Sequence, residues 1–129
     1  MVESAGSITL LIIDDDPAAC RIFKKILGEV GYHVLTATDA GRGLRLIQEK
    51  SPEIVFLDIK MPRIDGIELL RRIRKANQDV IVIMLTGFAT LDTARKAMEL
   101  GAHDYVTKPF DLEAIKASIR DALEVNASD

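Results

Sequence analysis

Four apolar stretches of the chain each end at a side chain that could take part in chemistry. The first runs into Asp14 and Asp15, the second into Asp58, the third into Thr86 and the fourth into Lys108. Carboxylates gathered opposite one amine suit a hard divalent cation together with a phosphoryl group, because the charges balance only when both are present. These residue types predict metal-assisted phosphoryl chemistry, provided that the fold brings the four strand ends together.

The functional groups suggest a role for each of these residues. The carboxylate of Asp58 can attack phosphorus and form an aspartyl phosphate, while a cation shields the repulsion between the nucleophile and the phosphoryl oxygens. The hydroxyl of Thr86 and the amine of Lys108 can each contact a phosphoryl oxygen. Purely structural roles are the alternatives for two of the aspartates. Asp16 is expected to cap the following helix, and Asp58 taken alone could be a solvated acid at a strand end.

Strand and helix patterns alternate five times along the chain, which predicts an α/β fold with a doubly wound parallel sheet and helices on both faces. The first, third and fourth apolar runs are the most continuous, so they should lie at the centre of the sheet, with the first beside the third. Strands are expected at residues 9–13, 32–36, 54–57, 80–85 and 105–106, and helices at about 17–30, 40–50, 67–75, 91–100 and 112–124.

Length and composition restrict the class of protein. With 129 residues and no linker-like tract, residues 1–129 are expected to form a single domain with a core at about 8–124. Cys20 is the only cysteine, so neither an intrachain disulfide nor a CxxC motif can form, which fits a cytoplasmic protein. The net charge of −3 and the absence of tryptophan argue against direct nucleic acid binding, and no apolar run is long enough to span a membrane.

Four segments together resemble the receiver domains of bacterial two-component response regulators: LLIIDDDP, VFLDIKMPRIDG, VIMLTGFA and DYVTKPF. They follow the order and the spacing of that family, and the resemblance covers nearly the whole chain. It implies a flavodoxin-like sheet of five parallel strands in the order 2-1-3-4-5. It also implies a phosphoprotein that works in phosphorelay signal transduction.

The resemblance assigns roles to individual positions. Asp58 would accept the phosphoryl group, and Thr86 and Lys108 would complete the catalytic set. A Mg²⁺ ion, with Mn²⁺ as the alternative, would be held mainly by carboxylates. Its direct ligands would be Asp15, Asp58 and the backbone carbonyl of Lys60, and Asp14 would act through water.

A switch and a set of partners are also implied. Movement of Thr86 toward a phosphoryl oxygen would vacate space for the ring of Tyr105, which would alter the surface of the fourth helix, fifth strand and fifth helix. That surface would bind a partner or a second copy in a homodimer. The phosphoryl donor would be a sensor histidine kinase or a histidine phosphotransfer protein. The plainer interpretation of Tyr105 is a half-buried strand aromatic.

The function predicted from the sequence is therefore that of a signalling domain, and not of an enzyme beyond its own phosphoryl uptake and slow autodephosphorylation. One alternative is a phosphatase of the haloacid dehalogenase type. The motif order argues against it, because those enzymes resemble one another in an early Asp-x-Asp nucleophile motif and late paired acids. A scaffold independent of phosphorylation is the other alternative. The sequence identifies neither the kinase nor the output. It also leaves open whether the chain stands alone or belongs to a longer regulator or hybrid kinase.

Overall fold

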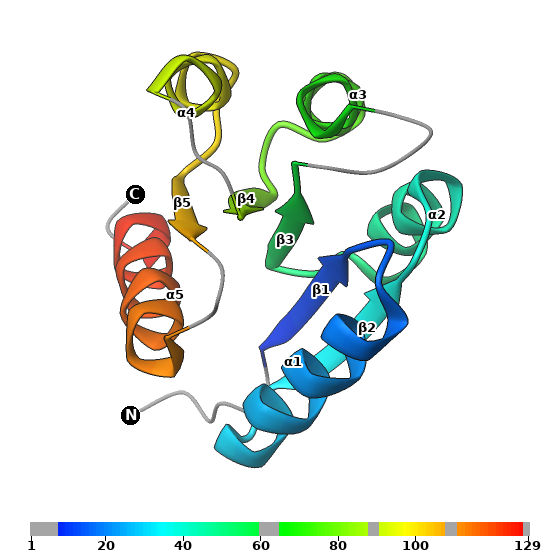
Figure 1. Cartoon of the computed structure of the whole chain (residues 1–129), viewed down its shortest axis with the longest axis vertical. Helices are drawn as coiled ribbons and strands as arrows, with labels where there is room; N and C mark the ends of the chain where they lie inside the picture. Colours follow the sequence, from blue (N-terminus) through cyan, green and yellow to red (C-terminus); the bar gives the residue numbers. More distant parts are fainter. Residues whose placement is uncertain (1–7, 60–64, 88–90, 108–110, 128–129) are drawn as a thin grey trace.

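The structure is a computed structural model that describes residues 8–59, 65–87, 91–107 and 111–127. Within these residues, five strands alternate with five helices (Figure 1). The strands are β1 (Thr9–Ile13), β2 (His33–Ala37), β3 (Ile54–Asp58), β4 (Ile81–Thr86) and β5 (Asp104–Thr107). The helices are α1 (Pro17–Val30), α2 (Ala40–Lys50), α3 (Gly66–Ala76), α4 (Leu91–Glu99) and α5 (Leu112–Ala127).

All five strands belong to one parallel sheet in the order β2-β1-β3-β4-β5, which confirms the predicted fold class and strand order. The pairing register aligns the carboxyl ends of the central strands. Ile13 of β1 pairs with Leu57 of β3, and Asp58 pairs with Leu85 of β4. The residues that follow β1 and β3 therefore emerge at the same edge of the sheet.

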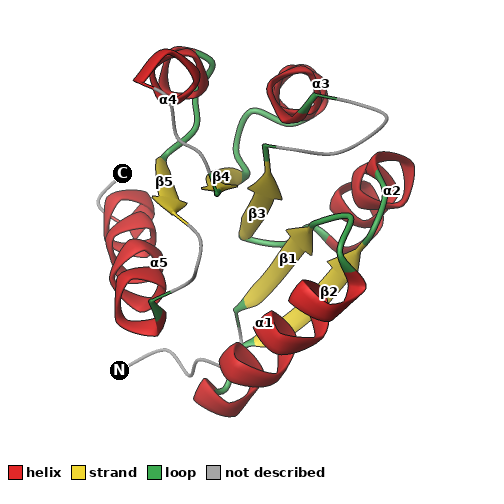
Figure 2. Cartoon of the chain, in the orientation of Figure 1, coloured by secondary structure: helices red, strands yellow, loops and turns green. Residues whose placement is uncertain are grey.

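Helices cover both faces of the sheet, as Figure 2 shows. On one face, Leu10, Ile12 and Phe56 pack against α1 and α5, where the rings of Phe23 and Phe56 meet edge to face with centroids 4.8 Å apart. On the other face, residues of alternate register such as Leu11 pack with α2, α3 and α4. Because both faces of the central strands are buried, their sequences are continuously apolar instead of alternating.

Most predicted helix bounds agree with the structure to within one residue, but α5 continues to Ala127, beyond the predicted end at about residue 124. The side chains of Asp16, Asp39 and Asp65 accept hydrogen bonds from the backbone N–H groups of Ala18, Arg42 and Ile67, respectively. Gly31 and Gly101 have φ angles of 117° and 95°, a left-handed conformation that favours glycine and turns the chain at the ends of α1 and α4. Each helix can therefore begin and end close to the sheet.

Two apolar residues near the ends of helices are exposed. Val30 and Met98 continue the apolar spacing of α1 and α4, yet their side chains are 37% and 44% exposed. Val30 is the last residue of α1, and Met98 lies one residue before the end of α4. An apolar residue in the last turn of a helix can extend past the edge of the sheet, where the spacing alone does not bury it.

None of the helices in the described part of the chain has the length and apolarity needed to cross a membrane.

Arg74 of α3 forms hydrogen bonds with two neighbouring segments. Its Nε and Nη2 donate to the carbonyl of Gly101 at 3.2 and 2.7 Å, and its Nη1 donates to the carbonyl of Val80. Partial burial lowers the pKa of Arg74 below its usual value, but a guanidinium keeps its charge in a protein. The side chain therefore joins the C-terminal part of α3 to the residue before β4 and to the turn after α4.

Replacing Arg74 with methionine is expected to lower the free energy of unfolding by about 1–3 kcal/mol, because three hydrogen bonds to carbonyls are lost. Arg72→Met is the matched control, since Arg72 is 58% exposed and its contact with Glu68 spans 3.8 Å. An exposed pair of this kind contributes less than about 1 kcal/mol. Urea unfolding of both variants measures the difference. Equal losses would show that the three hydrogen bonds of Arg74 add nothing to stability.

Candidate functional site

Three carboxylates meet at the edge of the sheet where β1 and β3 end. One carboxylate oxygen from each of Asp14, Asp15 and Asp58 lies within 4.8 Å of the other two. Asp14 is fully buried, Asp58 is 5% exposed and Asp15 is exposed to solvent. The convergence of these acids, predicted from the strand ends, is thus present in the folded chain.

The backbone around β1 fixes Asp14. Its N–H donates to the carbonyl of Ala37 at the end of β2 (3.0 Å), and the buried thiol of Cys20 lies 3.4 Å from the Asp14 carbonyl oxygen. Its carboxylate Oδ1 also accepts a hydrogen bond from the N–H of Asp16 at 3.0 Å. The carboxylate of Asp14 therefore shapes the turn into α1 as well as joining the cluster.

The donor set of this cluster fits a hard divalent cation. Carboxylates held this close repel one another, and the burial of Asp14 and Asp58 removes much of the water that would weaken the repulsion. Mg²⁺ and Mn²⁺ prefer oxygen ligands, and Mg²⁺ usually keeps several waters beside one or two carboxylates. The exposed position of Asp15 leaves one side of the cluster open to solvent, where those waters can remain.

Gly66, the first residue of α3, belongs to this site although the sequence analysis did not single it out. Its N–H donates to the carbonyl of Ile59 at 2.9 Å. A Cβ at this position would lie 2.5 Å from Cα of Ile59 and 2.7 Å from the carbonyl oxygen of Asp58, both backbone atoms. The start of α3 therefore packs directly against the backbone of Asp58, at a distance that only glycine allows.

Of the other predicted site residues, the structure describes the backbone of Thr86 and the whole of Tyr105. Thr86 is the last residue of β4 and pairs with Thr107 of β5, so its backbone lies at the same sheet edge as Asp58. The side chain of Thr86 and the whole of Lys60 and Lys108 lie outside the described residues. Tyr105, the candidate switch residue, is in β5 opposite Met84, with its side chain 41% exposed.

The comparison with known protein families assigns this chain to one of them. Residues 10–120 match the family described as the response regulator receiver domain. The probable transcriptional regulator ycf27 of Guillardia theta is 40% identical over 114 residues, which are 88% of this chain and 44% of that protein. The transcriptional regulatory protein ZraR of Klebsiella oxytoca is 34% identical over 120 residues, which are 93% of this chain and 27% of that protein.

Solved structures agree with the sequence comparison. A CheY-like response regulator receiver domain protein from Methanospirillum hungatei JF-1 superimposes with a TM-score of 0.88 and is 33% identical, covering 94% of this chain and 97% of the other. A response regulator receiver domain protein from Clostridium thermocellum has a TM-score of 0.87 and 35% identity, covering 93% and 97%. By contrast, the chain spans less than half of the length of the two curated relatives named above.

Proposed function

Because this chain belongs to the family of response regulator receiver domains, we propose that it accepts a phosphoryl group on Asp58 and passes the signal on through a change of its surface. The observation that carries this proposal is the group of three carboxylates at one sheet edge, in which Asp58 is nearly buried at the end of β3. A lone solvated acid at a strand end would not need two further acids within 4.8 Å.

The proposed reaction is a phosphoryl transfer to a carboxylate. One Oδ of Asp58 attacks phosphorus and forms an O–P bond, while the bond between phosphorus and a histidine nitrogen of the donor breaks. The bonding electron pair stays on that imidazole nitrogen. With acetyl phosphate as the donor, the P–O bond breaks and acetate leaves. Thr86 and Lys108 are proposed to contact the phosphoryl oxygens from the ends of β4 and β5.

We propose that Mg²⁺, or Mn²⁺ in its place, binds at this edge. Asp15, Asp58 and the backbone carbonyl of Lys60 would be its direct ligands. Asp14 would act through water, which agrees with its full burial and with the hydrogen bond that its Oδ1 already accepts from Asp16. When bound, the ion neutralises the crowded carboxylates and the phosphoryl oxygens that approach them.

The partner classes follow from the family and from the relatives. The donor would be a sensor histidine kinase or a histidine phosphotransfer protein in the cytoplasm. Two relatives are named as transcriptional regulators and are more than twice as long as the matched part. We therefore propose that residues 1–129 act as one receiver domain whose output is transcriptional control by a further domain or a partner. The domain itself would be a signalling module and not a turnover enzyme.

Incubation of the wild-type chain with acetyl phosphate and Mg²⁺ is the test of this function. The intact mass should increase by one phosphoryl group, and the increase should disappear when a chelator removes the ion. The aspartyl phosphate should also decay slowly after the donor is removed. Repeated turnover of a phosphate ester without a stable adduct would instead favour a phosphatase, and a chain that gains no phosphoryl group would contradict the proposal.

Tyr105 is proposed to couple phosphorylation to the surface formed by α4, β5 and α5. Its side chain is 41% exposed on β5, so the ring has solvent on one side and room to change its orientation. Tyr105→Ala should leave phosphoryl uptake intact, but it should reduce the gain in partner binding or dimerisation on phosphorylation by several-fold. Sedimentation or titration with and without acetyl phosphate measures this gain. An unchanged gain would show that Tyr105 is an ordinary strand aromatic.

A further inference from the structure

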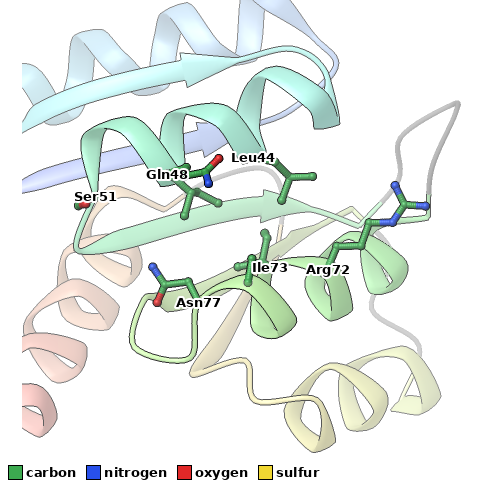
Figure 3. A pocket seen from close by; sticks show the side chains of 8 residues that line it. Leu44, Gln48, Ser51, Arg72, Ile73 and Asn77 are labelled. Carbon is green, nitrogen blue, oxygen red and sulfur yellow. The ribbon is translucent and has the colours of Figure 1, made fainter.

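A cavity of about 380 Å³ separates α2 from α3 (Figure 3). Half of the described residues that line it are aliphatic, with Leu44 and Ile47 on α2 and Ile73 and Ala76 on α3. Figure 3 shows the side chains of Leu44 and Ile73 pointing toward each other across the gap. Clefts that bind ligands commonly measure roughly 300–1,000 Å³ and combine apolar walls with a few polar groups. The volume of this cavity lies within that range, and its lining combines aliphatic with polar side chains.

Polar side chains line the opening of the cavity. Gln48 and Asn77 contribute amides, and Arg72 contributes a guanidinium that Figure 3 shows at one end of the gap. Glu68 lies 3.8 Å from Arg72 but also contacts Arg71 at 3.6 Å, so a single carboxylate is shared by two guanidinium groups. Glu68 consequently neutralises Arg72, the one charged side chain among the described lining residues, only in part.

The positive charge extends over both helices. Their exposed basic residues outnumber their acids, although the chain as a whole has a net charge of −3. The exposed bases are Arg42, Arg45, Lys50, Arg71, Arg72 and Lys75, and the acids are Glu49 and Glu68. Among the described residues that line the cavity, Arg72 is the one base, and the other bases lie elsewhere on the exposed surface of the two helices. The cavity thus lies between two helices whose exposed charged residues are mostly basic.

We propose that this α2–α3 groove, defined by the residues that line the cavity, binds an acidic amphipathic segment of a partner protein. An aliphatic side chain of the segment would enter the cavity, and flanking carboxylates would contact Arg72 and be attracted by the other exposed bases of the two helices. A nucleic acid fits less well, because none of the described residues that line the cavity is aromatic, so bases would find no ring to stack on. The proposal does not depend on phosphorylation of Asp58.

The groove lies apart from the surface proposed for the phosphorylation switch. Figure 1 shows α2 near one edge of the sheet, beside β2 and β1, and α5 near the opposite edge, beside β5. A segment bound between α2 and α3 would leave α5 and β5 uncovered. The domain could therefore hold one partner at this groove and present a different one with its phosphorylation state.

A designed peptide provides the test. The probe is a fluorescein-labelled helical peptide of about 14 residues, made of Ala, Leu and Glu, with Leu at positions i and i+4 and Glu on both sides of that stripe. The wild-type chain should bind it saturably in an anisotropy titration, and the backbone amide NMR signals of Leu44, Gln48 and Ala76 should shift. A peptide with Lys in place of Glu, and one with Ser in place of Leu, should each bind at least about tenfold more weakly, a loss of about 1.4 kcal/mol.

Variants of the protein complete the experiment. Arg72→Glu and Ala76→Trp should each weaken binding at least about tenfold, the first by reversing a charge at the opening and the second by filling the cavity. Arg21→Glu makes the same charge change on an exposed position of α1, across the sheet, and should bind like the wild type. The proposal would be overturned if the wild type failed to bind the Glu peptide, if the two Arg→Glu variants had equal effects, or if the NMR shifts were centred on α5. It would also be overturned if a duplex oligonucleotide displaced the peptide and Ala76→Trp bound the peptide as tightly as the wild type.

Discussion

Asp58→Asn should abolish phosphoryl uptake, with a loss of at least about 100-fold in the rate of adduct formation from acetyl phosphate. An amide is nearly the same size as a carboxylate, but it has no negative oxygen that can attack phosphorus. The substitution also removes one of the three carboxylates of the cluster, so Mg²⁺ should bind more weakly. Intact-mass measurement with acetyl phosphate and Mg²⁺ records the first effect directly.

Asp16→Asn is the matched control for this substitution. Asp16 lies two residues after Asp14 and caps α1 through a 3.0 Å hydrogen bond from Ala18, and asparagine caps helices about as well as aspartate. This variant should therefore take up a phosphoryl group like the wild type. If Asp58→Asn took up a phosphoryl group as fast as the wild type, the acceptor would be another residue. Loss of uptake in both variants would indicate a disturbed fold.

Metal linkage gives a second readout that does not depend on the donor. A ligand that binds only the folded chain stabilises it by RT ln(1 + [L]/Kd), about 1.4 kcal/mol when its concentration is about nine times Kd. Mg²⁺ should raise the Tm of the wild type and of Asp16→Asn. It should raise the Tm of Asp58→Asn much less. A shift of equal size in all three proteins would mean that the ion binds elsewhere.

Gly66→Ala should lower the free energy of unfolding by about 2–4 kcal/mol, a large effect for one added methyl group. The new Cβ would overlap Cα of Ile59 and the carbonyl oxygen of Asp58, and backbone atoms of a strand end cannot move aside as a flexible side chain can. The higher helix propensity of alanine offsets only about 1 kcal/mol of this cost. Because the overlap is with Asp58 itself, the folded fraction should also take up phosphoryl groups more slowly.

Gly28→Ala is the control for the glycine experiment. Gly28 lies within α1, and a Cβ there would meet nothing within 4 Å. The same substitution should therefore stabilise the chain by about 0.5–1 kcal/mol and leave uptake unchanged. Thermal or urea unfolding of the two variants should give shifts of opposite sign. Destabilisation of similar size in both would show that close contact at Gly66 is not the cause.

Much of the fold follows from local patterns in the sequence. Apolar runs buried on both faces, the capping positions of Asp16 and Asp39, and the glycines at 31 and 101 each specify an element or its end within a few residues. The alternation of these elements specifies a parallel sheet, and the ends of parallel strands share one edge. The sequence therefore determined that the acids after the first and third strands would lie near one another.

Other features depend on distances between segments that no local pattern contains. The 4.8 Å grouping of the three carboxylates requires the β1–β3 register, and the glycine at position 66 is required only because α3 begins against the backbone of Asp58. The reach of Arg74 to Gly101 is likewise a product of packing, and in sequence this arginine resembles its exposed neighbours. The groove between α2 and α3 exists because each helix packs on the sheet and leaves space between their facing sides. Sequence periodicity determines which way a side chain faces, but only tertiary packing determines what lies opposite it.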